Sequence, residues 1–175
     1  MAHPKKATDR HLADLHTKTL VELIGSASTA PGAGAAGAIA LALAAACAAK
    51  AVSISQKHSP DPARLTVAHT RLDTVRDFAL QGADIDALAF TQFIRNQTTA
   101  SATNLAETGQ RMEWLIKALF SIIEEVEPVI SQTMKGDLVA ARALGTAART
   151  IQSANETQAT AAAERLAQPE HDKTT

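Results

Sequence analysis

The chain has 175 residues, a length that suits a single domain. Its 17 basic and 18 acidic residues nearly cancel, so the net charge gives no reason to expect nucleic acid or a membrane surface as a partner. With four phenylalanines, one tryptophan and no tyrosine, it lacks the aromatic residues on which nucleic-acid bases stack. Because Cys47 is the single cysteine, an intramolecular disulfide and a thiolate zinc site are excluded, and a cytoplasmic location is expected.

The pattern of apolar residues predicts helices throughout, because no segment alternates apolar and polar residues with period two. The first helix is expected over residues 12–26, with an apolar face formed by Leu15, Leu20, Leu23 and Ile24. A second helix follows Pro31, a residue that suits a helix start, and runs to about Ser55.

Residues 31–49 of this second helix are uncharged and almost long enough to span a membrane. Most of them are Ala or Gly, which contribute little transfer energy, and Lys50 then interrupts the run. About thirty mixed polar residues precede it, which is not the arrangement of a signal peptide. We therefore expect no membrane association, but a thin helix whose neighbours pack closely, including one from a second subunit.

Three longer helices complete the prediction. The third covers residues 63–96, and the fourth covers residues 100–133 with a kink at Pro128. After a break at Met-Lys-Gly-Asp, the fifth runs from Leu138 to about Leu166.

We expect these five main helices to form an all-α antiparallel bundle with one domain over residues 11–167. The polar ends, residues 1–10 and 168–175, are expected to be disordered. The apolar stripes are long for so small a core, so a homodimer is expected, through small-residue surfaces that include part of residues 36–51.

Two apolar stripes lead to polar residues. In the third helix the stripe reaches Asp86, and in the fifth it reaches Asn155. Burying such groups without a partner costs free energy, and burial raises a carboxyl pKa so that the group can both donate and accept a proton. Alternatively, Asp86 or Asp84 caps a helix that restarts after Gln-Gly-Ala-Asp, and Asn155 is a satisfied core residue.

Three further positions have two interpretations each. Asp137 stands at the head of the stripe that ends in Asn155, although its place after Lys-Gly favours the N-cap of the fifth helix. Gly32 and Gly34 permit close backbone approach at a helix start, where free N–H groups attract anionic or polar ligand atoms. The alternative is that these glycines only allow tight packing of a core helix.

The order of four motifs resembles that of the formiminotransferase-cyclodeaminase C-terminal family, which includes methenyltetrahydrofolate cyclohydrolases. The motifs are "APGAGAAGA" before a small-residue helix, "SISQKH" at its end, "DALAF", and "GDLVAARALGTAART" followed by Asn155. The resemblance covers roughly residues 15–160.

The resemblance implies an all-α dimer with folate sites near the subunit contact. Cyclodeaminases of the family close 5-formimino-tetrahydrofolate to the 5,10-methenyl form and release ammonia, and its cyclohydrolases open the methenyl ring with water. The Asp of the "DALAF" motif, Asp86, would be the proton donor and acceptor. Five positions would bind the substrate or shape its pocket: Gly32, Gly34, Lys57, Asp137 and Asn155.

The implied ligand is a small-molecule substrate, a tetrahydrofolate derivative, with no covalently bound cofactor. The scattered histidines predict no metal site.

The sequence also departs from the family pattern. Ala33 and Ala35 stand where the family has Gly and Ser, and Ala159 replaces a second Asn. These changes keep open a related C–N ring reaction on another substrate. They also keep open a non-catalytic ligand-binding or structural helical dimer.

Overall fold

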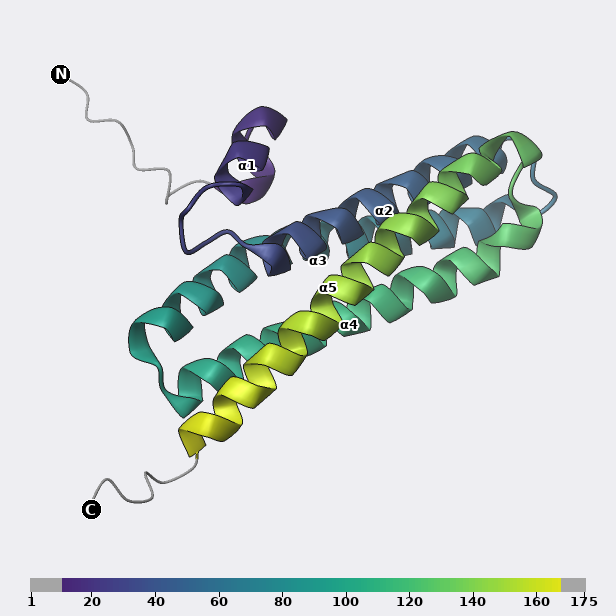
Figure 1. Cartoon of the computed structure of the whole chain (residues 1–175). Helices are drawn as coiled ribbons and strands as arrows, with labels where there is room; N and C mark the ends of the chain where they lie inside the picture. The colour runs from purple at the N-terminus through teal and green to yellow at the C-terminus, as the bar shows by residue number, and fades with distance from the viewer. Residues whose placement is uncertain (1–10, 168–175) are drawn as a thin grey trace, which may run out of the picture.

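The computed structural model describes residues 11–167, in which five α-helices and three short 3-10 turns are joined without a strand (Figure 1). The expected disordered tails, residues 1–10 and 168–175, lie outside the described residues. The elements are η2 (Leu12–Asp14), α1 (Thr17–Ile24), α2 (Ala33–Gln56), α3 (Pro62–Asn96), α4 (Thr99–Val126), η3 (Glu127–Val129), η4 (Gln132–Met134) and α5 (Lys135–Ala167). The four long helices form an antiparallel bundle, with α1 beside the start of α2, which confirms the all-α prediction (Figure 1).

The first predicted helix, over residues 12–26, is wrong as a single element. Its start is the short turn η2, which ends at the extended residue Leu15, and α1 begins only at Thr17. Asp84 of α3 accepts a hydrogen bond from the backbone N–H of Leu12 at 2.8 Å and contacts His11 Nδ1 at 3.0 Å. This attachment holds Leu12 in the core, and the chain must turn before α1 can start.

The third helix is continuous from Pro62 to Asn96, with Asp61 as its N-cap. The Asp61 side chain accepts a hydrogen bond from the backbone N–H of Arg64 at 3.0 Å. No helix restarts after Gln-Gly-Ala-Asp, so the alternative that Asp84 or Asp86 caps a new helix is wrong.

The boundaries near residue 130 also differ from the prediction. Helix α4 ends at Val126, and Pro128 lies in the following 3-10 turn rather than at a kink. Proline lacks the N–H that would continue the helical ladder, so the chain leaves the helix there. Helix α5 begins at Lys135, which places Asp137 in its first turn, and the preferred N-cap assignment of Asp137 is therefore wrong.

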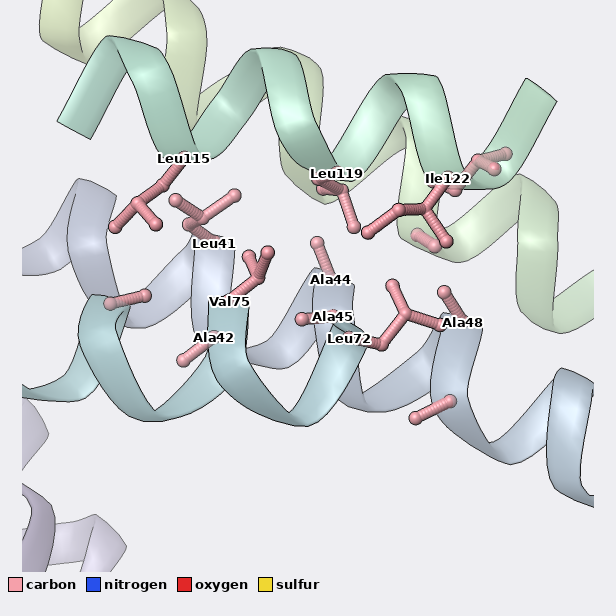
Figure 2. Packing of buried hydrophobic residues seen from close by; sticks show 14 of the residues in the cluster. Leu41, Ala42, Ala44, Ala45, Ala48, Leu72, Val75, Leu115, Leu119 and Ile122 are labelled. Carbon is pink, nitrogen blue, oxygen red and sulfur yellow. The ribbon is translucent and has the colours of Figure 1, made fainter. Parts of the chain in front are cut away.

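Helix α2 is the centre of the bundle. It packs mainly against α3 and α5, and alanines line most of its buried surface. Figure 2 shows Ala44, Ala45 and Ala48 among leucine and isoleucine side chains of α3 and α4. The helix is long and apolar enough to cross a membrane, but over half of its most apolar stretch is buried inside the bundle.

Candidate functional site

A pocket of about 580 Å³ opens at the end of the bundle where α2 begins. Four helices supply its wall: the first turn of α2, the second half of α3, the first half of α4 and the second half of α5. Its volume lies within the range of roughly 300–1,000 Å³ typical of small-molecule sites. Its lining includes Gly32, Gly34, Asp86, Phe90, Phe93, Leu105, Gly109, Gln152, Asn155 and Ala159.

Four of the six predicted site residues line this pocket together. Gly32 and Gly34 come from the start of α2, Asp86 from α3 and Asn155 from α5. Asp86 and Asn155, the two polar residues found on apolar stripes, are both half-buried. Polar groups from three helices therefore converge on one cavity that also has apolar walls.

The other two predicted residues lie elsewhere in the chain. Lys57 is the C-cap of the 24-residue helix α2, so it stands roughly 36 Å from the pocket end of that helix. Asp137 precedes Asn155 by about five helical turns, roughly 27 Å. Its carboxylate pairs with Lys50 Nζ at 3.2 Å, at the end of the bundle away from the pocket. Within one chain, neither residue forms part of this pocket.

Burial raises the pKa of the Asp86 carboxyl from 3.8 to about 6. Desolvation is the main cause, and a backbone hydrogen bond from Ala35 lowers the pKa by a smaller amount. The neighbouring Ala83 and Ala89 are buried, and Phe90 lies one turn further along the pocket wall. Asp86 is thus protonated in part of the molecules near neutral pH, which suits a group that gives and takes protons.

The carboxylate of Asp86 lies directly over the Cα atom of Gly34. A Cβ atom added to Gly34 would overlap both carboxylate oxygens and their carbon. By contrast, a Cβ added to Gly32 would meet nothing within 4 Å. Close approach therefore requires a glycine at position 34, and the group that approaches is Asp86.

Gln152, a pocket residue that is only 7% exposed, is not among the site residues predicted from the sequence. The apolar stripe that leads to Asn155 in the sequence takes a step of three, from Ala148 to Ile151. The buried face of α5 instead runs through Gly145, Ala148 and Gln152. A step of four from Ala148 would have identified Gln152 by the same rule that identified Asp86.

Gly34→Ala should lower the free energy of unfolding by about 1–3 kcal/mol, because the new methyl group must displace the Asp86 carboxylate. Gly32→Ala is the matched control and should cost less than about 1 kcal/mol, the difference expected from alanine at an N-cap. Urea denaturation of both variants checks this. Equal losses at the two positions would contradict the contact between Gly34 and Asp86.

The stability of the protein should depend on the titration of Asp86. Because its pKa is higher in the folded chain, the folded state binds this proton more tightly than the unfolded state. The contribution of the protonated group to stability should thus be present below about pH 4 and lost as pH rises through about 6.

Asp86→Asn removes this titration. The difference in free energy of unfolding, variant minus wild type, should therefore increase by about 1–3 kcal/mol from pH 4 to pH 7.5. The lower part of this range allows for the partial solvent exposure of the carboxyl group. Urea denaturation of both proteins at the two pH values measures the difference. Parallel pH profiles would show that Asp86 has an ordinary pKa.

Comparisons with known proteins give the family and the fold of the chain. Residues 16–159 match the family model described as formiminotransferase-cyclodeaminase. No curated protein matches the chain in sequence. The fold resembles the crystal structure of formiminotetrahydrofolate cyclodeaminase from Thermotoga maritima, with a TM-score of 0.82 at 16% identity over 86% of this chain and 80% of that chain. Because the family model spans most of its length, the chain belongs to the formiminotransferase-cyclodeaminase family.

Proposed function

We propose that the chain is a cyclodeaminase or cyclohydrolase that acts on a folate one-carbon unit, with Asp86 as its proton shuttle. The observation that carries this proposal is a carboxyl group with a raised pKa in a pocket of ligand size. Family membership and the fold support a folate-related role. The proposed substrate is a tetrahydrofolate derivative bearing a one-carbon group between two nitrogens.

Both reactions need one group that first accepts and then donates a proton. In the cyclodeaminase direction, N10 of 5-formimino-tetrahydrofolate attacks the formimino carbon and loses its proton to Asp86. Asp86 then protonates the departing nitrogen, the C–N bond breaks, and ammonia leaves the 5,10-methenyl product. In the cyclohydrolase direction, Asp86 accepts a proton from the attacking water and returns it to the ring nitrogen whose bond to the one-carbon unit breaks. The second proton of the water passes to solvent as the formyl C=O forms. No net proton remains on the enzyme in either case.

The surroundings of Asp86 fit this role. Part of the pocket wall is apolar and is formed by Phe90, Phe93 and Leu105. A flat ring can lie against this wall, and the wall excludes water. The start of α2 contributes backbone N–H groups that lack helical partners, and Gly32 provides no capping side chain. A low-polarity wall keeps the carboxyl pKa high until substrate arrives, while the nearby backbone dipoles can bind polar substrate atoms.

A second function, ligand binding without turnover, is favoured by the residues that differ from the family pattern. Ala159 lines the pocket where the resemblance leads one to expect a second Asn. Ala35 stands where a serine hydroxyl is expected, and its backbone N–H reaches Asp86. Two polar groups are thus replaced by methyl groups at or beside the proposed reaction centre.

Asp86→Asn should lower the rate of 5,10-methenyl-tetrahydrofolate consumption, or of its formation from 5-formimino-tetrahydrofolate, by about 10²–10⁴-fold. The amide keeps the shape of the side chain and removes its titrating proton, so substrate affinity should change little. The methenyl absorbance measures the rate, and calorimetry measures binding. Asp77→Asn, an exposed position on the same helix, is the control.

Three results separate the possibilities. An Asp86→Asn rate within about threefold of the wild-type rate, far smaller than general acid–base effects, would contradict the role of Asp86. A wild-type protein that binds folate without turnover would support the binding function. Absence of both binding and turnover would contradict the folate assignment.

We also propose that two copies associate as a homodimer. Most small residues of the segment 36–51 are buried within one protomer, leaving side chains such as Leu43 exposed. A second apolar surface runs over α3 and α4, where Phe78, Ile85 and Trp114 are exposed by 43–70% and border a hollow of about 390 Å³. It includes two large aromatic side chains, whereas the exposed large apolar residues of α2 are Leu43 and Ile54, so it offers the better apolar contact.

Light scattering at micromolar concentration should give twice the chain mass of 18.3 kDa. Trp114→Glu should yield monomers, because a carboxylate would be placed in the centre of the contact, whereas Leu43→Glu should leave the dimer intact. Monomers from Leu43→Glu alone would place the contact on α2. A monomeric wild-type protein would contradict the dimer.

A further inference from the structure

Gln152 differs from the other buried polar residues of the described chain. Ser55 accepts a hydrogen bond from the backbone N–H of Ser131 at 2.9 Å, Ser101 takes part in the capping box of α4, and Thr108 donates to the Asn104 carbonyl at 2.9 Å. Within residues 11–167, the Gln152 carboxamide makes no hydrogen bond, although only 7% of the residue is exposed. With no protein partner, this carboxamide can exchange a water molecule for a ligand group that matches its donors and acceptor.

The carboxamide of Gln152 lies in the wall of the pocket. A Cβ atom at Gly109 of α4 would stand 2.5 Å from Gln152 Nε2, so the space used by the carboxamide exists because position 109 has no side chain. Gly109 and Gln152 both line the pocket. Across the described residues, no fully enclosed side-chain nitrogen or oxygen lacks a partner, so the accessible remainder of this carboxamide opens on the cavity.

A carboxamide presents a carbonyl acceptor and N–H donors side by side in one plane. Its complement is a planar group that has one N–H and one C=O next to each other, as on the edge of a cyclic amide. Such a group forms two hydrogen bonds with the carboxamide at once. The apolar wall made by Phe90, Phe93 and Leu105 suits the faces of the ring that carries this edge.

We infer that Gln152 is a specificity-determining residue that binds the cyclic-amide edge of a fused heteroaromatic ring in the pocket. The inference deepens the proposed function and rests on it for the choice of a pterin as that ring. Asn155, one turn further along α5, lines the same pocket and is placed to contact the neighbouring polar atoms of the ring. Asp86, from helix α3 at another part of the pocket wall, remains available for the one-carbon chemistry.

The test compares pterin with 3-methylpterin, in which a methyl group replaces the N–H of the cyclic-amide edge. Affinities are measured by protein NMR titration with each ring alone, so that no turnover is needed. The wild-type protein should bind pterin at least about 10-fold more tightly, since the methylated ring leaves the carboxamide unpaired. Gln152→Leu should lose most of this preference. Leucine has a similar bulk, so a preference caused only by exclusion of the methyl group would persist.

Two further variants complete the experiment. Gln110→Leu is the matched control, because Gln110 is exposed on α4 and does not line the pocket, and it should keep the wild-type preference. Gln152→Met keeps the length of the side chain but removes both the carbonyl acceptor and the N–H donors, so it should lose the preference as well. Melting temperatures without ligand provide a separate measurement. Gln152→Leu should melt no lower than the wild type, because the carboxamide has no protein partner to lose.

The inference is overturned if the wild type binds both rings equally or neither at millimolar concentration, or if Gln152→Leu keeps the preference. A clear fall in the melting temperature of Gln152→Leu would also overturn it, because the carboxamide would then serve the fold. Pterin preference without folate turnover would contradict the proposed catalysis and support the inference. Turnover without the preference would contradict the inference alone.

Discussion

The bundle depends on the small side chains of α2. Ala44, Ala45 and Ala48 are fully buried, and their methyl groups allow α3, α4 and α5 to approach a common axis. Larger residues such as Leu72 and Leu119 fill the space from the outer helices (Figure 2). This division between a thin central helix and bulky partners gives a close-packed core despite the shortage of aromatic residues. It also fixes where α2 begins relative to the helices around it, and so where the pocket lies.

The pocket follows from the same constraint. Because α2 is central, its first turn faces both the second half of α3 and the second half of α5. Gly34 then allows the Asp86 carboxylate to lie against the α2 backbone, while Gly109 gives space to Gln152 on the opposite wall. The two glycines thus accommodate two polar side chains in the pocket wall. Burial of the Asp86 carboxyl raises its pKa.

Local periodicity was enough to predict five main helices and the position of Asp86, because a carboxylate on a buried stripe is visible in the sequence itself. Helix ends were harder to predict. The start of α5 is set by the turn η4 and by burial of Met134, so Asp137 fell within the helix instead of capping it. The pairing of Asp137 with Lys50, and the separation of Lys57 from the pocket, depend on how whole helices pack. Such contacts between distant segments produce no repeating pattern of residue types in the sequence.

Some residues of the pocket wall are synthesised early and others late, because they are far apart in the chain. Gly34 is made early, whereas Gln152 and Asn155 lie in the last part of α5. A chain cut or ended prematurely just after Ala148 would still contain the alanines of α2 and their partners on α3 and α4, but it would lack one side of the cavity. The pocket therefore needs the last part of α5, whereas the packing around α2 does not depend on it to the same extent.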